Sequence, residues 1–129
     1  MTRTARDDGQ CRRVAPHVDQ RGTAAVEFAL VQVGLLVRDR LLVEAAVRSG
    51  ARTAAVEPGD DAVRAAVLRA APALEAGAVS VATARAGSLG DPVTVTLIYD
   101  APIRVPFVSW LFPSGVTMRA EATDRQEFA

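Results

Sequence analysis

The feature that most constrains this chain is an unbroken stretch, residues 23–56, that contains no proline. Proline breaks a helix because its ring removes a backbone hydrogen bond and clashes with the preceding turn. The only glycines in the stretch are Gly34 and Gly50. The stretch therefore predicts one long helix, and a chain of 129 residues leaves room for a single domain with a modest core.

The two halves of this predicted helix differ in character. Residues 23–37 are apolar almost all round and are interrupted only by Glu27 and Gln32. The second half is amphipathic, because small apolar residues recur there at helical spacing along one side. Its charged residues step by four along another side, where the order Glu44 to Arg48 favours an ion pair on a solvated face.

A second, shorter helix is expected after the long one. Residues 57–60 read Glu-Pro-Gly-Asp, which predicts a turn between two helices, and Pro72 closes the second of them. Asp60 is expected to cap this helix, because its side chain can accept hydrogen bonds from the free N–H groups of the first turn.

Beyond residue 77 the hydrophobic pattern changes from a helical period to a period of two. This alternation predicts strands at 79–85, 93–100 and 116–124. Residues 101–115 carry three prolines, which exclude a central strand there. We therefore expect an α+β protein with a long N-terminal helix, a short second helix and a small three-stranded antiparallel sheet.

Charge is distributed unevenly along the chain. Residues 1–22 hold five arginines and three aspartates, although the net charge of the whole chain is zero. A short positive segment before an apolar run is typical of a membrane-targeted N-terminus, but a polar tail without a targeting role fits equally well. The chain thus divides into a leader, 1–22, a helix with a shortened apolar segment, 23–56, and a small α+β region, 57–129.

Composition argues against several functions. The basic residues are all arginines and are balanced by equally many acids, so nothing indicates nucleic-acid binding. The single cysteine, Cys11, and the single histidine, His17, both lie in the leader. No metal-ligand spacing and no serine nucleophile motif is present. We expect no enzymatic activity, no cofactor and no metal.

The start of the long helix resembles a known class of proteins. The stretch RG-TAAVEFALV, residues 21–31, is similar to the N-terminus of type IV pilin-like proteins. In that class a prepilin peptidase cuts after a glycine and leaves an apolar helix with glutamate at its fifth position. The resemblance implies cleavage between Gly22 and Thr23 and places the glutamate at Glu27.

More narrowly, the chain resembles TadE-like proteins, which are minor pseudopilins of the tight-adherence (Flp) pilus system. AAVRSGARTAA, residues 45–55, and RAEATDRQE, residues 119–127, are similar to stretches of that family. The resemblance implies an accessory subunit that assembles a pilus or a related secretion apparatus. Its implied partners are other pilus or pseudopilin subunits, the prepilin peptidase and the cell membrane, crossed once with the C-terminal region outside the cytoplasm.

The resemblance also implies an assembly role for Glu27, whose carboxylate would meet the N-terminal amine of a neighbouring subunit. A carboxylate at the centre of a membrane helix costs ~2.5–3.5 kcal/mol on insertion scales, and less near a helix end. The alternative is that Glu27 faces water near the N-terminus of a soluble helix, where the helix dipole favours it.

The apolar run is short for a membrane span. Residues 23–37 cover roughly 22 Å of a hydrocarbon core that is ~30 Å thick. Charged residues 38–40 follow at once, so we expect marginal insertion helped by snorkelling arginines. A secretory signal peptide is an alternative, against which Glu27 and Gln32 argue. The other alternative is a soluble α+β binding module that self-associates through its apolar helix.

An aromatic segment, residues 105–113, is a further candidate contact site. It contains Phe107, Trp110 and Phe112. If exposed, these side chains would form an adhesive patch for another subunit. If they fold inward, they belong to the core, and this is the interpretation that we favour.

Overall fold

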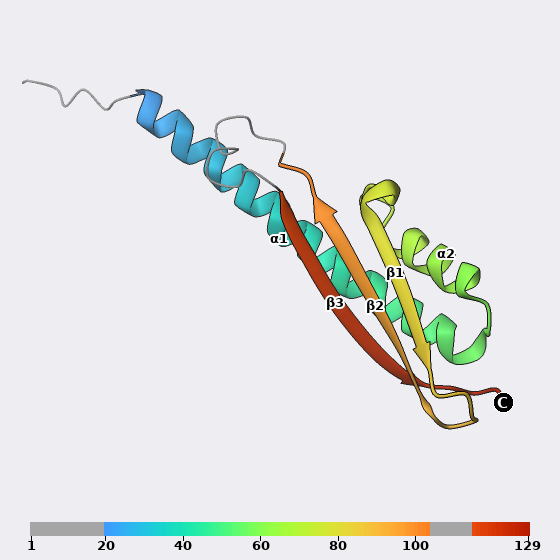
Figure 1. Cartoon of the computed structure of the whole chain (residues 1–129). Coiled ribbons are helices and arrows are strands. Elements are labelled where there is room, and N and C mark those ends of the chain that lie inside the picture. Colours follow the sequence, from blue (N-terminus) through green and yellow to red (C-terminus); the bar gives the residue numbers. More distant parts are fainter. Residues whose placement is uncertain (1–19, 104–114) are drawn as a thin grey trace, which may run out of the picture.

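The computed structural model describes residues 20–103 and 115–129. Within these ranges it contains two α-helices, one 3-10 turn and three strands (Figure 1). Their bounds are α1 Gln20–Val56, α2 Asp60–Ala70, η1 Ala76–Ala78, β1 Val79–Arg85, β2 Pro92–Ala101 and β3 Val116–Arg125. The predicted α+β class is confirmed, and the strands begin and end within one residue of the predicted bounds.

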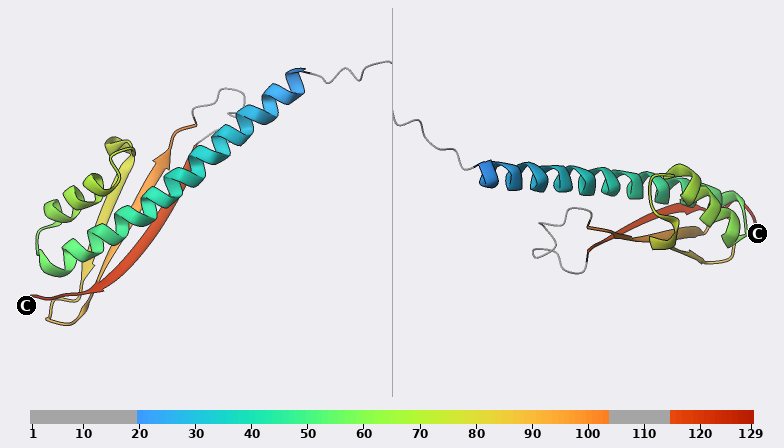
Figure 2. Two further views of the ribbon diagram at one scale, coloured as in Figure 1. Left: turned by 180° about the vertical axis from the view of Figure 1, so that it is seen from behind. Right: turned by 90° about the horizontal axis from the view of Figure 1, so that it is seen from above.

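The three strands form an antiparallel sheet in the order β1-β2-β3. In its register, Leu97 of β2 lies between Val81 of β1 and Ala120 of β3. These three side chains share one face, because residues directly opposite each other in an antiparallel pair point the same way. Both helices cover this face: α1 runs along β2 and β3, and α2 lies beside α1 near β1 (Figure 2).

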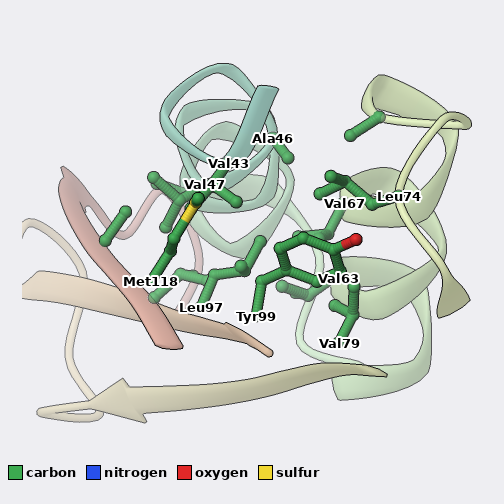
Figure 3. Packing of buried hydrophobic residues seen from close by; sticks show 14 of the residues in the cluster. Val43, Ala46, Val47, Val63, Val67, Leu74, Val79, Leu97, Tyr99 and Met118 are labelled. Carbon is green, nitrogen blue, oxygen red and sulfur yellow. The ribbon is translucent and has the colours of Figure 1, made fainter. Parts of the chain in front are cut away.

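The core fills the space between the sheet and the helices. From Val93 to Ala101, every second side chain of β2 is buried, as expected for a strand with one covered face. Figure 3 shows Leu97 and Tyr99 meeting side chains from both helices and from β3, among them Val43, Ala46, Val47, Val63, Val67 and Met118. Because most of these side chains are small, the helices must approach the sheet closely to exclude water.

Helix α1 extends well beyond the sheet that it covers (Figure 2). Its 37 residues span about 55 Å at ~1.5 Å per residue. Apart from Gln32, every buried residue of α1 lies at or beyond Val43. The part of α1 before Val43 instead exposes large apolar side chains, namely Val26, Phe28, Leu30, Val31, Val33, Val37 and Leu41.

The predicted capping role of Asp60 is wrong. The N-cap of α2 is Gly59, and no side chain caps this helix. Asp60 is the first helical residue, and its carboxylate accepts a hydrogen bond from Arg85 Nη1 at 2.5 Å. Arg85 Nη2 also donates to the carbonyl of Glu57 at 3.3 Å. The end of β1 therefore holds the turn between the two helices.

The ion pair predicted between Glu44 and Arg48 is also wrong. Glu44 accepts from Arg40 Nη2 at 2.6 Å, one helical turn in the other direction. The reason is tertiary: Arg40 Nη1 donates to the backbone carbonyl of Arg119 in β3 at 2.7 Å, which holds the guanidinium beside Glu44.

On each edge strand of the sheet, a backbone carbonyl accepts a hydrogen bond from an arginine of a helix. On β3 this is the contact between Arg40 and Arg119. On β1, Arg64 of α2 donates to the carbonyl of Val79 at 3.3 Å. Open edges offer unpaired backbone groups to other strands, and charged side chains placed there disfavour such pairing.

Candidate functional site

The buried and exposed sides of α1 define a candidate contact surface. Its core-facing side carries residues at the three- and four-residue spacing of one helix face, namely Val43, Ala46, Val47, Gly50 and Ala54. The opposite side is exposed along the helix. This side, the outer face of α1, comprises Glu27, Leu30, Gly34, Arg38, Leu41, Ala45, Arg48 and Arg52.

The outer face changes in character along the helix. Its two leucines, Leu30 and Leu41, are each 66% exposed. Around Gly34 the surface is open, since a β-carbon added there would meet no atom within 4 Å. Glu27 is the only acidic residue of the outer face, and its three arginines all follow toward the C-terminal end of the helix. The face therefore has an acidic N-terminal end, a middle in which Arg38 lies between the two leucines, and a basic C-terminal end.

The carboxylate of Glu27 is exposed, and no hydrogen bond or ion pair joins it to another residue in the described part of the chain. The next cation along the same face is Arg38, about 16 Å away along the helix axis. An unpaired carboxylate costs little in water but much in a dry contact. Any surface that covers Glu27 must therefore supply a cation or a hydrogen-bond donor.

The predicted cleavage position lies in the first turn of α1, because this helix begins at Gln20 and includes Gly22 and Thr23. The N–H groups of a first turn lack intrahelical partners, so this turn opens at lower cost than the helix interior. Thr23 and Glu27 are four residues apart and lie on one side of the helix. An amine created at Thr23 would thus lie one turn from a glutamate.

Comparisons with protein-family models, with curated protein sequences and with solved structures found no match. The described residues include no helix that is both long enough and apolar enough to span a membrane. Nor, within residues 20–103 and 115–129, do three or more histidine, cysteine, aspartate or glutamate side chains gather to hold a metal ion. The outer face of α1 is the strongest functional feature of these residues.

The burial of Gln32 was not predicted from the sequence. This residue interrupts the apolar run, yet it is only 2% exposed, and its Oε1 has no hydrogen-bond partner among the described residues. Gln32 lies eleven residues before Val43 and therefore on the core-facing side of the helix. This spacing is the feature of the sequence that could have indicated its burial. Gln32 borders a hollow with room for a single water molecule, which is also lined by Leu35, Arg38, Asp39, Ala73 and Pro102. Such a hollow is too small for a substrate.

The aromatic contact site predicted at Phe107, Trp110 and Phe112 lies outside the described residues. Whether these side chains form a contact patch or part of the core stays a prediction.

Proposed function

We propose that this protein is a TadE-like minor pseudopilin, an accessory subunit in the assembly of a tight-adherence (Flp-type) pilus or a related secretion apparatus. The division of α1 is the observation that supports this function best. Its second half packs on the sheet, whereas its first half exposes large apolar side chains around the carboxylate of Glu27. Apolar surface that a chain leaves uncovered marks a contact with protein or membrane. The subunit acts by contact and not by catalysis.

In this function the first half of α1 is buried against the membrane and against other pilus subunits. A prepilin peptidase removes the leader by cutting between Gly22 and Thr23. The carboxylate of Glu27 then pairs with the new N-terminal amine of a neighbouring subunit, which offsets the cost of burying it. The positive leader, 1–22, keeps the N-terminal end cytoplasmic, and the sheet region lies outside the cytoplasm.

A soluble α+β binding module that self-associates through α1 is the second candidate. The observation that favours it is that apolar and charged side chains alternate along the exposed part of the helix. Exposed apolar side chains continue to Leu41, past the charged residues 38–40. A protein partner accommodates this alternation more easily than hydrocarbon, in which charged groups are costly.

Co-expression of the full chain with a cognate prepilin peptidase tests the proposal. We expect N-terminal sequencing to give Thr23 as the first residue, and the processed chain to sediment with membranes and to co-purify with other pilus subunits. Gly22→Ile should block cleavage, whereas Gly34→Ile, at another exposed glycine of the same helix, should not. An N-terminus still at Met1, beside a peptidase that cleaves another pilin, would favour the soluble module.

A further inference from the structure

Residues of the outer face of α1 recur at a spacing of eleven. An α-helix makes three turns in about eleven residues, so residues at this spacing lie on one side of the helix with a drift of only about 20°. The outer face contains four such pairs, and all their residues are exposed: Glu27 with Arg38, Leu30 with Leu41, Gly34 with Ala45, and Leu41 with Arg52.

The members of the first three pairs suit each other as contact partners, whereas the fourth joins an apolar residue to a charged one. The first pair joins opposite charges, the second joins two leucines that are each 66% exposed, and the third joins two small residues. Contact between the leucines would remove apolar area from water. The small residues would let two helix backbones approach closely. Neither Glu27 nor Arg38 takes part in a hydrogen bond or ion pair within the described ranges.

A second copy of the chain brings these pairs together if it lies parallel to the first and is displaced by eleven residues, or about 16 Å. Glu27 of one copy is then level with Arg38 of the other, and Leu30 is level with Leu41. Without the displacement, each Glu27 meets another Glu27 and each Arg38 meets another Arg38. Like charges placed opposite each other are unfavourable, so charge disfavours the undisplaced register, and the match of Leu30 with Leu41 favours a displacement of eleven.

An antiparallel pair of outer faces can match these charges but not the leucines. When Glu27 is level with Arg38 of the second copy, Arg38 of the first copy is also level with Glu27 of the second, and the symmetry axis passes between positions 32 and 33. Leu30 is then level with position 35, so it does not meet Leu41. The parallel, displaced pair joins opposite charges, leucines and small residues at once.

We propose that the outer face of α1 binds a second copy of this chain in parallel orientation, displaced by eleven residues, with Glu27 of one copy paired to Arg38 of the next. The parallel orientation rests on the proposed function, in which all copies share one orientation in the membrane. The two oxygens of the Glu27 carboxylate can accept from this guanidinium and from an N-terminal amine together. Because the two copies use different residues, the contact is head-to-tail.

Disulfide cross-linking in the full chain tests the register. With Cys11 replaced by serine, a Leu30→Cys copy is co-expressed with a Leu41→Cys copy, and we expect the 30–41 product to dominate. Ser80→Cys, at an exposed position of β1, measures random collision. A dominant 30–30 product would indicate an undisplaced pair, and a dominant 30–34 product with Gly34→Cys would indicate an antiparallel one in which Glu27 is level with Arg38. Either result, or a 30–41 yield at the collision level, overturns the proposal.

Charge reversal tests the pairing itself. Glu27→Arg or Arg38→Glu alone should lower the 30–41 yield several-fold, because like charges then lie level with each other. The double variant restores opposite charges and should restore the yield. Arg52→Glu is the matched control, because this exposed arginine is level with Leu41 and not with a charged residue. A double variant that cross-links no better than the single variants overturns the charge pairing.

Different results would overturn the self-association and the pseudopilin function. A chain that is cleaved before Thr23 and co-purifies with pilus subunits, but gives no 30–41 product, overturns self-association alone. A chain that is never cleaved but still gives the 30–41 product overturns the pseudopilin function and leaves self-association standing.

Discussion

Gly50 of α1 lies so close to Val67 of α2 that a β-carbon at position 50 would come within 2.7 Å of a Val67 Cγ2 atom. The same β-carbon would lie 3.4 Å from Val95 of β2 and 3.7 Å from Val63 of α2. The missing side chain therefore sets the distance between the two helices and lets both of them rest on the sheet.

Replacing Gly50 by alanine is expected to destabilise the fold. Relative to glycine, alanine stabilises a helix by about 1 kcal/mol. A methyl group forced into a packed contact destabilises the fold by about 1–3 kcal/mol. We expect a net loss in the free energy of unfolding, measured by urea titration. Gly34→Ala is the control, because its β-carbon would meet nothing within 4 Å and only the gain in helix propensity remains. Equal changes in the two variants would contradict the close contact.

Leu97 and Ile98 are neighbours on β2 that point to opposite faces of the sheet. Leu97 is fully buried under the helices, whereas Ile98 is half-buried on the face that they leave uncovered. Leu97→Ala is expected to cost about 2–5 kcal/mol, as for other large-to-small core changes. Ile98→Ala should cost clearly less in the same thermal melts. A similar cost for both would mean that a partner covers the second face in solution.

Arg85 is expected to matter more for stability than the carboxylate that it binds. Its side chain is 18% exposed and that of Asp60 is 70% exposed. Arg85→Ala removes donors to Asp60 and to the Glu57 carbonyl, with an expected loss of about 1–3 kcal/mol. Asp60→Asn removes only an exposed charge, with an expected loss of about 0.5 kcal/mol. Asp61→Asn controls for the helix dipole, and a larger effect of Asp60→Asn than of Arg85→Ala would refute this ranking.

Glu27→Leu is expected to separate assembly from folding. The free energy of unfolding should hardly change, because Glu27 is exposed and has no partner among the described residues. Retention in membranes should stay the same or increase, since a charge leaves the apolar run. Pull-down of other pilus subunits should weaken, with Glu27→Asp intermediate because its side chain reaches less far. An unchanged pull-down would show that Glu27 is not part of the interface with these subunits.

Five or six leucines inserted after Val33 are expected to convert marginal membrane insertion into firm insertion. The apolar run, 23–37, falls about five residues short of the ~20 that a spanning helix needs. The sheet should be undisturbed, because the inserted residues lengthen the part of α1 that lies before its packed half. Carbonate extraction compares the two chains. Equal resistance would show that the arginines snorkel effectively, and loss of both from the membrane would favour the soluble module.

The elements of this fold could be predicted because their signals are local. The proline-free stretch predicted α1, and alternating side chains predicted the three strands to within one residue, since burial of one face imposes its period on the sequence. Glu27 could be identified as a candidate site residue from the sequence, because it is the single carboxylate in an apolar run. The start of α1 was less well defined, and the helix includes Gly22 and begins at Gln20.

The partners of individual side chains could not be predicted in this way. Local spacing favoured Arg48 for Glu44, but the packing of α1 on β3 draws Arg40 to a carbonyl of the sheet edge and so beside Glu44. In the same way Asp60 meets Arg85, 25 residues away, rather than capping its own helix. The limit between the covered and exposed halves of α1 also depends on where the ten-residue strands end. Such contacts between residues that are far apart in the sequence follow from close packing of the whole domain, which local preferences do not determine.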